Sequence, residues 1–364
     1  MSLFYGREQM RKKYIFGVIS ILIAAGLQSC SSSLAVPLFE YPPEMKDAAV
    51  RENIVKDYSA YLAGKKIFLD AGHGGEDRKN KDKNGIVTEA DVNLRVVLNL
   101  KKYLEEAGAQ VFLSREDDKT VDLGFRSELA NNSGAEFFIS IHHNAPGKSE
   151  DDFTDYTSTY YHAKDESYEY DPSNRDLARY IERDLAYAMR NSGGLGSFDG
   201  TYSDYIIYPG EGFSVLRKSK IPAVLVECAF HTSRFEILRL NNEEFNQIQA
   251  WGIFKGLAKY LRASKPEIKI VSDSLMDGND NFVLEFDLHD STGINPKSIQ
   301  VFVDKSEKEF TYDKVSGKVL LKTDALQPGE HLLKIVAANK NGNYSFPFRK
   351  KIIVSDDLSV RIAD

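Results

Sequence analysis

Cysteine is scarce in this sequence, and no apolar run is long enough to span a bilayer easily. The 364 residues include two cysteines, Cys30 and Cys228, which excludes a framework of several disulfides as the source of stability. Basic residues are also in the minority, because 47 Lys and Arg face 54 Asp and Glu for a net charge of −7. An acidic chain repels phosphate backbones, so nucleic acid is not an expected partner. The length and the hydrophobic share of 42% are sufficient for one large or two ordinary packed domains.

The N-terminus has the organisation of a bacterial export signal. Three cations at positions 11–13 precede the apolar run Tyr14–Leu27, which is shorter than the roughly 20 residues of a membrane-spanning helix. The run is followed by the sequence LQSC, which resembles a lipoprotein cleavage box that ends at a lipidated cysteine, here Cys30. We therefore expect residues 1–29 to be a lipoprotein signal peptide and Cys30 to anchor the chain in the outer membrane, facing the periplasm. The alternative is a short membrane anchor that is never cleaved, and both interpretations export the rest of the chain.

After an expected tether at residues 30–45, the chain alternates helices and strands as far as residue 264. A first helix has apolar residues at helical spacing, followed by Gly64 as a stop signal; its expected buried face is Val50, Ile54, Tyr58 and Leu62. Short apolar strands then alternate with amphipathic helices. We expect strands at 67–69, 111–113, 137–142 and 222–230, and helices at 92–107, 173–189 and 243–261. This alternation predicts an α/β fold for residues 46–264, an open and mostly parallel sheet with helices on both faces.

The pattern changes to a period of two after Pro266. Apolar residues from Phe282 to Leu288 alternate with polar ones, and pairs such as Ser316-Gly317 and Asn341-Gly342 indicate turns. Short strands with regular turns predict an immunoglobulin-like β-sandwich domain at residues 265–364. The segment has no recognisable ligand cluster. A spacer role and a role in binding the cell wall or a cell-envelope protein both remain open for it.

Four polar motifs lie where strands are expected to end or in a loop beside a strand. His73 lies in the Gly-rich turn DAGHGG, and Glu89 comes just ahead of the helix expected at 92–107. His142 lies in SIHHN, and Glu227 ends the apolar strand PAVLVE. The carboxyl ends of strands in an open α/β sheet form the crevice where ligands bind. We therefore expect His73, His142 and Glu227 to face one cleft.

These residue types indicate metal-assisted hydrolysis. Two histidines and a carboxylate form the donor set of a catalytic zinc site with a position left open for water. The carboxylate of Glu227 would be costly to bury unpaired, so it must face a metal, a cation or a cleft. In partly apolar surroundings its pKa should rise toward the range of a general base.

The four motifs resemble those of the zinc-dependent N-acetylmuramoyl-L-alanine amidases. DAGHGG, the glutamate before DVNL, the stretch that ends in FISIHHNA, and PAVLVE occur in the family's order across about residues 65–262. The resemblance implies that His73, Glu89 and His142 bind Zn²⁺ and that Glu227 is the catalytic acid/base. It also implies hydrolysis of the amide between N-acetylmuramic acid and L-alanine in peptidoglycan, for cell-wall remodelling, daughter-cell separation or recycling.

The resemblance extends to supporting positions and has two departures. Arg115, Arg126 and Asn144 match further family positions, which we interpret as structural or as supports of the ligands. The family usually has Glu-Lys-Asp-Val where this chain has Glu-Ala-Asp-Val, beginning at Glu89. It usually has Gly-Phe shortly after the last glutamate, where Cys-Ala-Phe follows Glu227 in this chain. Neither departure replaces an expected ligand.

Several neighbouring residues have two interpretations. His143 should point to the opposite face from His142, because side chains alternate along a strand, and is expected to be structural or peripheral. Asp77 either orients a ligand histidine or lies on the surface. Cys228 is expected to be a small buried apolar residue, and Arg217 faces either substrate or solvent.

The polar segment at residues 149–171 bears on regulation. Some family members carry an extra helix here that blocks the zinc until a partner removes it. Because this segment lacks helical periodicity and resumes as a strand at 159–161, we expect no such helix.

Three other functions remain open from the residues alone. They are a different zinc hydrolase on the same fold, such as a peptidase, a non-catalytic wall-binding lipoprotein, and a purely structural tether. A binding protein needs no general base, and a tether leaves the four motifs unexplained.

Overall fold

The computed structural model describes residues 37–363 apart from 148–149, 192, 194–198, 273–274 and 277–280. The expected signal peptide, Cys30 and the first part of the expected tether, up to residue 36, lie outside the described residues. The chain from Phe39 onward forms one compact unit. None of the described helices is both long and apolar enough to cross a membrane.

The α/β region is built on a six-stranded sheet with the order β2-β1-β3-β6-β4-β5. Strands β2, β1, β3 and β6 run parallel, β4 is antiparallel to β6, and β5 is parallel to β4. The strands are β1 (Lys66–Ala71), β2 (Gln110–Leu113), β3 (Phe137–Asn144), β4 (Ser158–Tyr161), β5 (Thr201–Ser203) and β6 (Ala223–Phe230). The expected mostly parallel sheet is confirmed.

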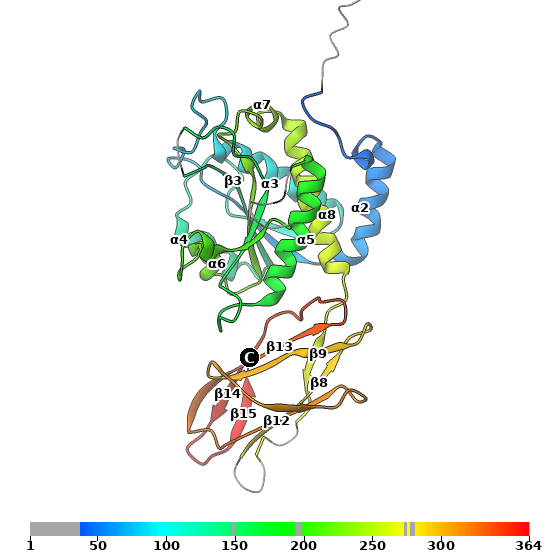
Figure 1. Ribbon diagram of the computed structural model, residues 1–364, viewed down its shortest axis with the longest axis vertical. Coiled ribbons are helices and arrows are strands. Elements are labelled where there is room, and N and C mark those ends of the chain that lie inside the picture. The colour runs from blue at the N-terminus through cyan, green and yellow to red at the C-terminus, as the bar shows by residue number, and fades with distance from the viewer. Residues whose placement is uncertain are drawn as a thin grey trace, which may run out of the picture. The chain divides into compact units, whose positions relative to one another are not determined.

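Helices cover both faces of this sheet (Figure 1). In β6, for example, Val224 and Val226 pack under the larger helical layer, whereas Leu225 packs on the opposite face with Val215 and Leu216. The larger layer contains α2 (Ala48–Leu62), α3 (Glu89–Glu106), α5 (Pro172–Met189), α7 (Ile237–Leu240) and α8 (Glu243–Arg262). The other face carries α4 (Leu123–Asn132) and α6 (Ser214–Arg217), and two short 3₁₀ turns are η1 (Pro43–Met45) and η2 (Asp204–Ile206). Burial on both faces explains why β6 is a continuous apolar run.

Two expectations for the helices, one on a buried face and one on a boundary, are wrong in detail. The buried face of α2 is Val55, Tyr58 and Leu62, whereas Val50 is 42% exposed because it lies in the first turn of the helix, beyond the core. Helix α3 begins at Glu89, three residues earlier than expected, so this carboxylate belongs to the first turn and interacts favourably with the helix dipole.

Part of the segment expected as a tether packs on α8. The ring centroids of Phe39 and Phe245 lie 5.4 Å apart. Glu44 in η1 accepts a hydrogen bond from the Trp251 indole at 3.2 Å and pairs with Lys255. Residues from Phe39 onward are therefore a part of the folded unit.

The C-terminal region consists of two antiparallel sheets that share one apolar core. One has the order β10-β9-β13-β14-β15 and the other β11-β12-β8-β7. Their strands are β7 (Glu267–Ile270), β8 (Phe282–His289), β9 (Ile294–Val303), β10 (Ser306–Glu307), β11 (Phe310–Tyr312), β12 (Lys318–Thr323), β13 (Gly329–Asn339), β14 (Phe348–Val354) and β15 (Val360–Ala363). Alternate side chains of β8, from Phe282 to Leu288, point into the core. The period of two in the sequence therefore describes a β-sandwich correctly.

Candidate active site

The turn after β1 holds His73 in an uncommon backbone conformation. The φ angle of His73 is +59°, in the left-handed region that few non-glycine residues adopt. Gly75 follows with φ of +59°, and a Cβ atom there would lie 2.3 Å from the Thr120 backbone nitrogen. Strain of this kind persists only when the surroundings determine it, and it is common at functional sites.

Two buried arginines stabilise this turn through its backbone carbonyl groups. Arg126 donates to the carbonyl of His73 at 3.0 Å and pairs with the buried carboxylate of Asp70 at 2.7 Å. Arg115 donates to the carbonyl of Gly72 at 3.1 Å. Removing one partner of a buried ion pair costs roughly 3–5 kcal/mol, because the other charge stays uncompensated. Both arginines therefore hold the turn in place, which agrees with their interpretation as structural or supporting residues.

Gly72 allows His142 to approach the same turn. A Cβ atom at position 72 would lie 2.2 Å from Cε1 of the His142 ring, closer than any real contact. His142 stands near the end of β3, and the Gly72 nitrogen donates to the carbonyl of Ile141 at 3.1 Å. Glycine is thus required for the close packing of the two histidine-bearing segments.

Glu89 is a buried carboxylate that is 2% exposed and has donors on several sides. Its Oε1 accepts from the His143 backbone nitrogen at 3.1 Å and from Asn93 at 3.3 Å. Its Oε2 accepts from the side-chain amide of Asn80 at 2.7 Å. These contacts fix the orientation of the carboxylate toward the two histidines.

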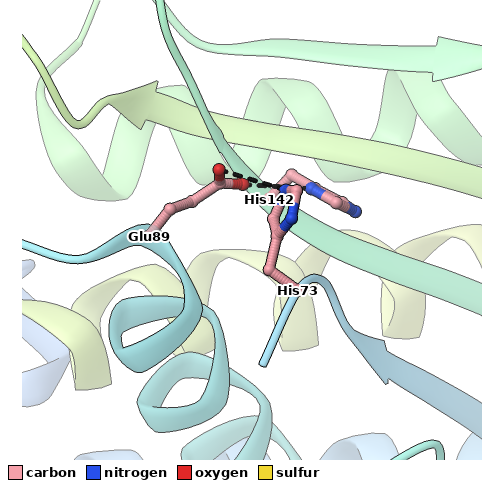
Figure 2. A group of neighbouring side chains, drawn as sticks. All are labelled: His73, Glu89 and His142. Carbon is pink, nitrogen blue, oxygen red and sulfur yellow. Dashed lines mark hydrogen bonds and ion pairs between the residues drawn. The ribbon is translucent and has the colours of Figure 1, made fainter. Parts of the chain in front are cut away.

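His73, Glu89 and His142 converge from a turn, a helix and a strand, as Figure 2 shows. Glu89 lies 3.2 Å from Nε2 of His73 and 3.0 Å from Nδ1 of His142. One donor atom from each of the three residues lies within 4.8 Å of the others. Among the described residues this is the one cluster of three His, Cys, Asp or Glu side chains with such spacing. It is a candidate metal site.

The electrostatics of the cluster favour positive charge. Burial lowers the pKa of His73, but the hydrogen bonds and charges of Glu89 and Asp77 outweigh burial and raise the pKa to about 9. Burial likewise opposes ionisation of Glu89, but His142 and His73 hold the pKa of this carboxyl well below its ordinary value. A cation is therefore stabilised between these side chains.

Glu227 joins the cluster through the register of the sheet. It is paired with His142 across β3 and β6, so the two side chains share a face of the sheet. The Oε2 atom of Glu227 is buried and has no hydrogen-bond partner in the described structure. Burial and the charge of Glu89 raise the pKa of Glu227 well above its ordinary value, against the opposing effect of His73.

A cleft of about 440 Å³ opens in front of these residues. His73, His142 and Glu227 line it together, as expected from the sequence. Leu123, which is 61% exposed, and Tyr208, which is 55% exposed, line it as well. Apolar side chains combined with a few polar groups are typical of the lining of a ligand-binding cleft.

The remaining predicted residues have clear positions. His143 is buried on the opposite face, where it contacts Asn93 at 2.7 Å and Gln249 at 2.9 Å; burial lowers the pKa of His143 to about 3. Its expected structural role is confirmed. Cys228 is free and fully buried, also as expected. Asn144 accepts a hydrogen bond from the nitrogen of Ala145, so it shapes its own turn, and it is not among the residues that line the cleft.

Asp77 and Arg217, for which two interpretations were open, both lie at the site. Asp77 contacts Nδ1 of His73 at 2.7 Å, so it orients the ring. Arg217 lines the cleft. Strand β4 forms where the sequence predicted a strand, and the described residues from Glu150 to Asp171 contain no helix.

Asn80 is the site residue that sequence reasoning missed. Its side chain lies 3.2 Å from Nε2 of His73 and bonds to Glu89, while its backbone carbonyl accepts from the Glu89 nitrogen at 2.9 Å. It lies in the polar stretch RKNKDKNG, which has no periodicity that could distinguish one polar residue from the next.

Comparison with known proteins identifies the family. The Amidase_3 family, N-acetylmuramoyl-L-alanine amidase, matches residues 67–259. The chain belongs to the N-acetylmuramoyl-L-alanine amidase family. It therefore has N-acetylmuramoyl-L-alanine amidase activity on peptidoglycan, which places it in the cell envelope outside the cytoplasm.

Individual relatives are similar over the same part of the chain. The germination-specific N-acetylmuramoyl-L-alanine amidase of Bacillus subtilis is 31% identical over 219 residues, which is 56% of this chain and 83% of the relative. The amidase CwlM of Bacillus licheniformis is 32% identical over 203 residues, which is 55% of this chain and 70% of the relative. A crystal structure of an N-acetylmuramoyl-L-alanine amidase from Clostridium difficile 630 is 29% identical, covers 55% of this chain and 98% of its own, and has a TM-score of 0.47.

Proposed function

We propose that this amidase is zinc-dependent, with His73, Glu89 and His142 as the metal ligands and Glu227 as the general acid/base. The donor set supports zinc, because two imidazoles and one carboxylate are typical of catalytic zinc sites in hydrolases. Zinc–ligand bonds of about 2.0–2.2 Å place neighbouring donor atoms of a tetrahedral site roughly 3–4 Å apart. In this cluster Glu89 lies 3.2 Å from Nε2 of His73 and 3.0 Å from Nδ1 of His142.

The hydrogen bonds around the cluster also suit a metal. Asp77 occupies Nδ1 of His73, so Nε2 is the atom left to bind metal. Asn93 and the His143 nitrogen support Glu89 from behind. Partners of this kind fix the orientation of metal ligands and raise their affinity.

In such a site, zinc supplies Lewis acidity that activates water and polarises the scissile carbonyl. Glu227 accepts the proton of the attacking water at its unpartnered Oε2. The new C–O bond to the lactyl carbonyl carbon forms as Glu227 takes this proton. The same carboxyl then delivers the proton to the nitrogen of L-alanine, and the bond between the carbonyl carbon and that nitrogen breaks. Burial and the charge of Glu89 raise the pKa of Glu227, which is the direction that suits a carboxyl acting as both proton acceptor and proton donor.

The single observation that carries this proposal is the convergence of two histidines and a buried carboxylate beside the orphaned Glu227 oxygen. Metal analysis tests it. The purified protein should bind about one zinc per chain, and His73→Ala and His142→Ala should each abolish binding. His331→Ala is the matched control, because His331 also pairs with a carboxylate, Asp304, but lies on the C-terminal domain away from the cluster. Full zinc retention in both cluster variants would refute the ligand assignment.

We propose further that the enzyme is a lipoprotein, lipidated at Cys30 after removal of residues 1–29, and that it faces the periplasm from the outer membrane. The cleavage box and the preceding apolar run support this proposal, and residues 46–264 and 265–364 would then form its catalytic and β-sandwich domains. Cys30→Ala should release the protein or leave it uncleaved in the inner membrane. An unchanged size and fractionation of that variant would argue against lipidation.

A further inference from the structure

A second hollow of about 390 Å³ lies beside the catalytic cleft. Its lining comes from three separate parts of the chain. The loop before α5 contributes Glu169, the segment between α6 and β6 contributes Lys220, and the C-terminal domain contributes Pro347 and Arg349. Arg217 lines both this hollow and the catalytic cleft, so the two spaces adjoin.

Buried polar contacts hold the C-terminal wall of the hollow in place. Lys334 on β13 is 2% exposed and donates to the carbonyls of Tyr168 and Tyr170 at 2.7 and 2.8 Å. Arg349 on β14 pairs with Asp171 at 2.7 Å. Because a buried ammonium without such acceptors would be costly, these contacts fix the loop before α5 against the C-terminal domain. The hollow is therefore a built feature of the folded unit.

Among the cationic side chains that line the hollow, Lys220 differs from the others in having no charged partner among the described residues. Arg349 pairs with Asp171, whose carboxylate also lies 3.6 Å from the ammonium of Lys334, and Glu169 accepts a hydrogen bond from the Tyr205 hydroxyl at 3.1 Å. Arg217 donates to backbone carbonyls and lies 3.8 Å from the carboxylate of Glu211. The ammonium of Lys220 has neither an ion pair nor a side-chain hydrogen bond to any described residue. An anion that enters the hollow would meet this ammonium.

We propose that this hollow is a subsite for a carboxylate of the peptidoglycan peptide, with Lys220 as its recognition residue. The proposal rests on the amidase function described above, because peptide extends away from the scissile amide and carries free carboxylates. The shared wall at Arg217 lets one substrate occupy the cleft and the hollow together. The C-terminal domain then shapes the substrate site through Pro347 and Arg349.

Binding affinities of the full-length protein and its variants for two peptides test the subsite without requiring catalysis. The probes are the free stem peptide isolated from peptidoglycan and the same peptide with its carboxylates amidated, each titrated by calorimetry. The parent should bind the free acid about fivefold more tightly, the upper range for one solvent-accessible charge pair. Lys220→Ala should lose this preference. Lys218→Ala is the matched control, because Lys218 is an exposed lysine two residues away that lines neither space, and it should keep the preference.

Two outcomes would overturn the proposal: a parent that does not distinguish the two peptides, or a Lys220→Ala variant that distinguishes them as well as the parent does. Neither depends on zinc content or turnover, so failure here is separate from failure of the proposed catalytic mechanism. A second arm locates the carboxylate by the KM of Lys220→Ala for disaccharide-peptide monomers and cross-linked dimers. A rise for both substrates places the carboxylate on the cleaved stem, and a rise for the dimer alone places it on the neighbouring stem.

Discussion

The carboxylate of Asp77 lies 2.7 Å from Nδ1 of His73, four residues earlier in the same turn. The contact fixes the ring so that its other nitrogen, Nε2, faces Glu89 at 3.2 Å. A histidine that donates one ring N–H to a carboxylate is a more basic and better oriented metal ligand. Asp77 thus acts as a positioning residue for His73.

Replacement of Asp77 should weaken metal binding without abolishing it. We expect Asp77→Ala to lower zinc affinity about 10- to 100-fold, as is usual when such a supporting carboxylate is removed. Asp77→Asn should recover part of the loss because it preserves a hydrogen-bonding group. Competition with a chelator measures the affinity, and Glu76→Ala, at a neighbouring exposed position, is the control. Equal affinities in the parent and in Asp77→Ala would show that the contact does not orient the ligand.

The close approach at Gly72 predicts a steric effect on the metal site. In Gly72→Ala the new methyl group would overlap the His142 ring, so the histidine or the turn must move. We expect zinc affinity to fall at least about tenfold and stability to fall by roughly 1–3 kcal/mol, the usual cost of overpacking. Gly147→Ala is the control, because a Cβ atom there meets nothing within 4 Å. Parent-like zinc binding and thermal stability in Gly72→Ala would contradict the packing described for this turn.

A buried carboxyl outside the cleft predicts how stability depends on pH. Glu236 is fully buried beside Arg239 and Asp155. Burial raises the pKa of Glu236 to about 8, with Arg239 opposing and Asp155 adding to the effect. Since the folded state keeps this proton and the unfolded state loses it near its ordinary pKa of 4.5, the free energy of unfolding should fall as pH rises from 5 to 8.

The variant Glu236→Gln removes this titration. As the pH rises from 5 to 8, the free energy of unfolding should fall less in the variant than in the parent. The difference should be up to about 4 kcal/mol, which is the effect of one proton over three pH units. Urea unfolding at both pH values, under identical metal conditions, measures the difference. Glu116→Gln, at an exposed position, should follow the parent. If Glu236→Gln and the parent lose stability equally, Glu236 is ionised in the folded state.

Much of the fold could be predicted from local sequence patterns. The apolar run of β6, the period of two in β8 and the helix that ends before Gly108 each carry a local signal that the structure reproduces. The sequence also predicted that His73, His142 and Glu227 share a cleft, because all three follow apolar strands whose ends meet at one edge of the sheet.

The rest depends on contacts between distant residues. The support that Asn80 gives to Glu89 arises from a polar loop without periodicity, and it becomes visible only when the loop folds back on α3. The antiparallel direction of β4 relative to β6 follows from the connection between the strands. The amino-acid sequence of β4 itself contains no signal for its direction. The hollow at Lys220 requires the C-terminal domain to lie against the loop before α5. No pattern within one segment encodes such pairings.

The most direct test of Glu227 as the general base is the variant Glu227→Gln. It is compared with the parent in one preparation for zinc content, for binding to peptidoglycan, and for release of peptide with a free L-alanine amino group. The amide keeps the volume of the side chain but cannot accept the proton of the attacking water. We expect unchanged zinc and unchanged binding to peptidoglycan, with product release lowered by at least about 100-fold, the contribution of a positioned general base. Parent-like product release from this variant would contradict the assignment of Glu227 as the base, and loss of zinc together with activity would show that Glu227 is itself a metal ligand.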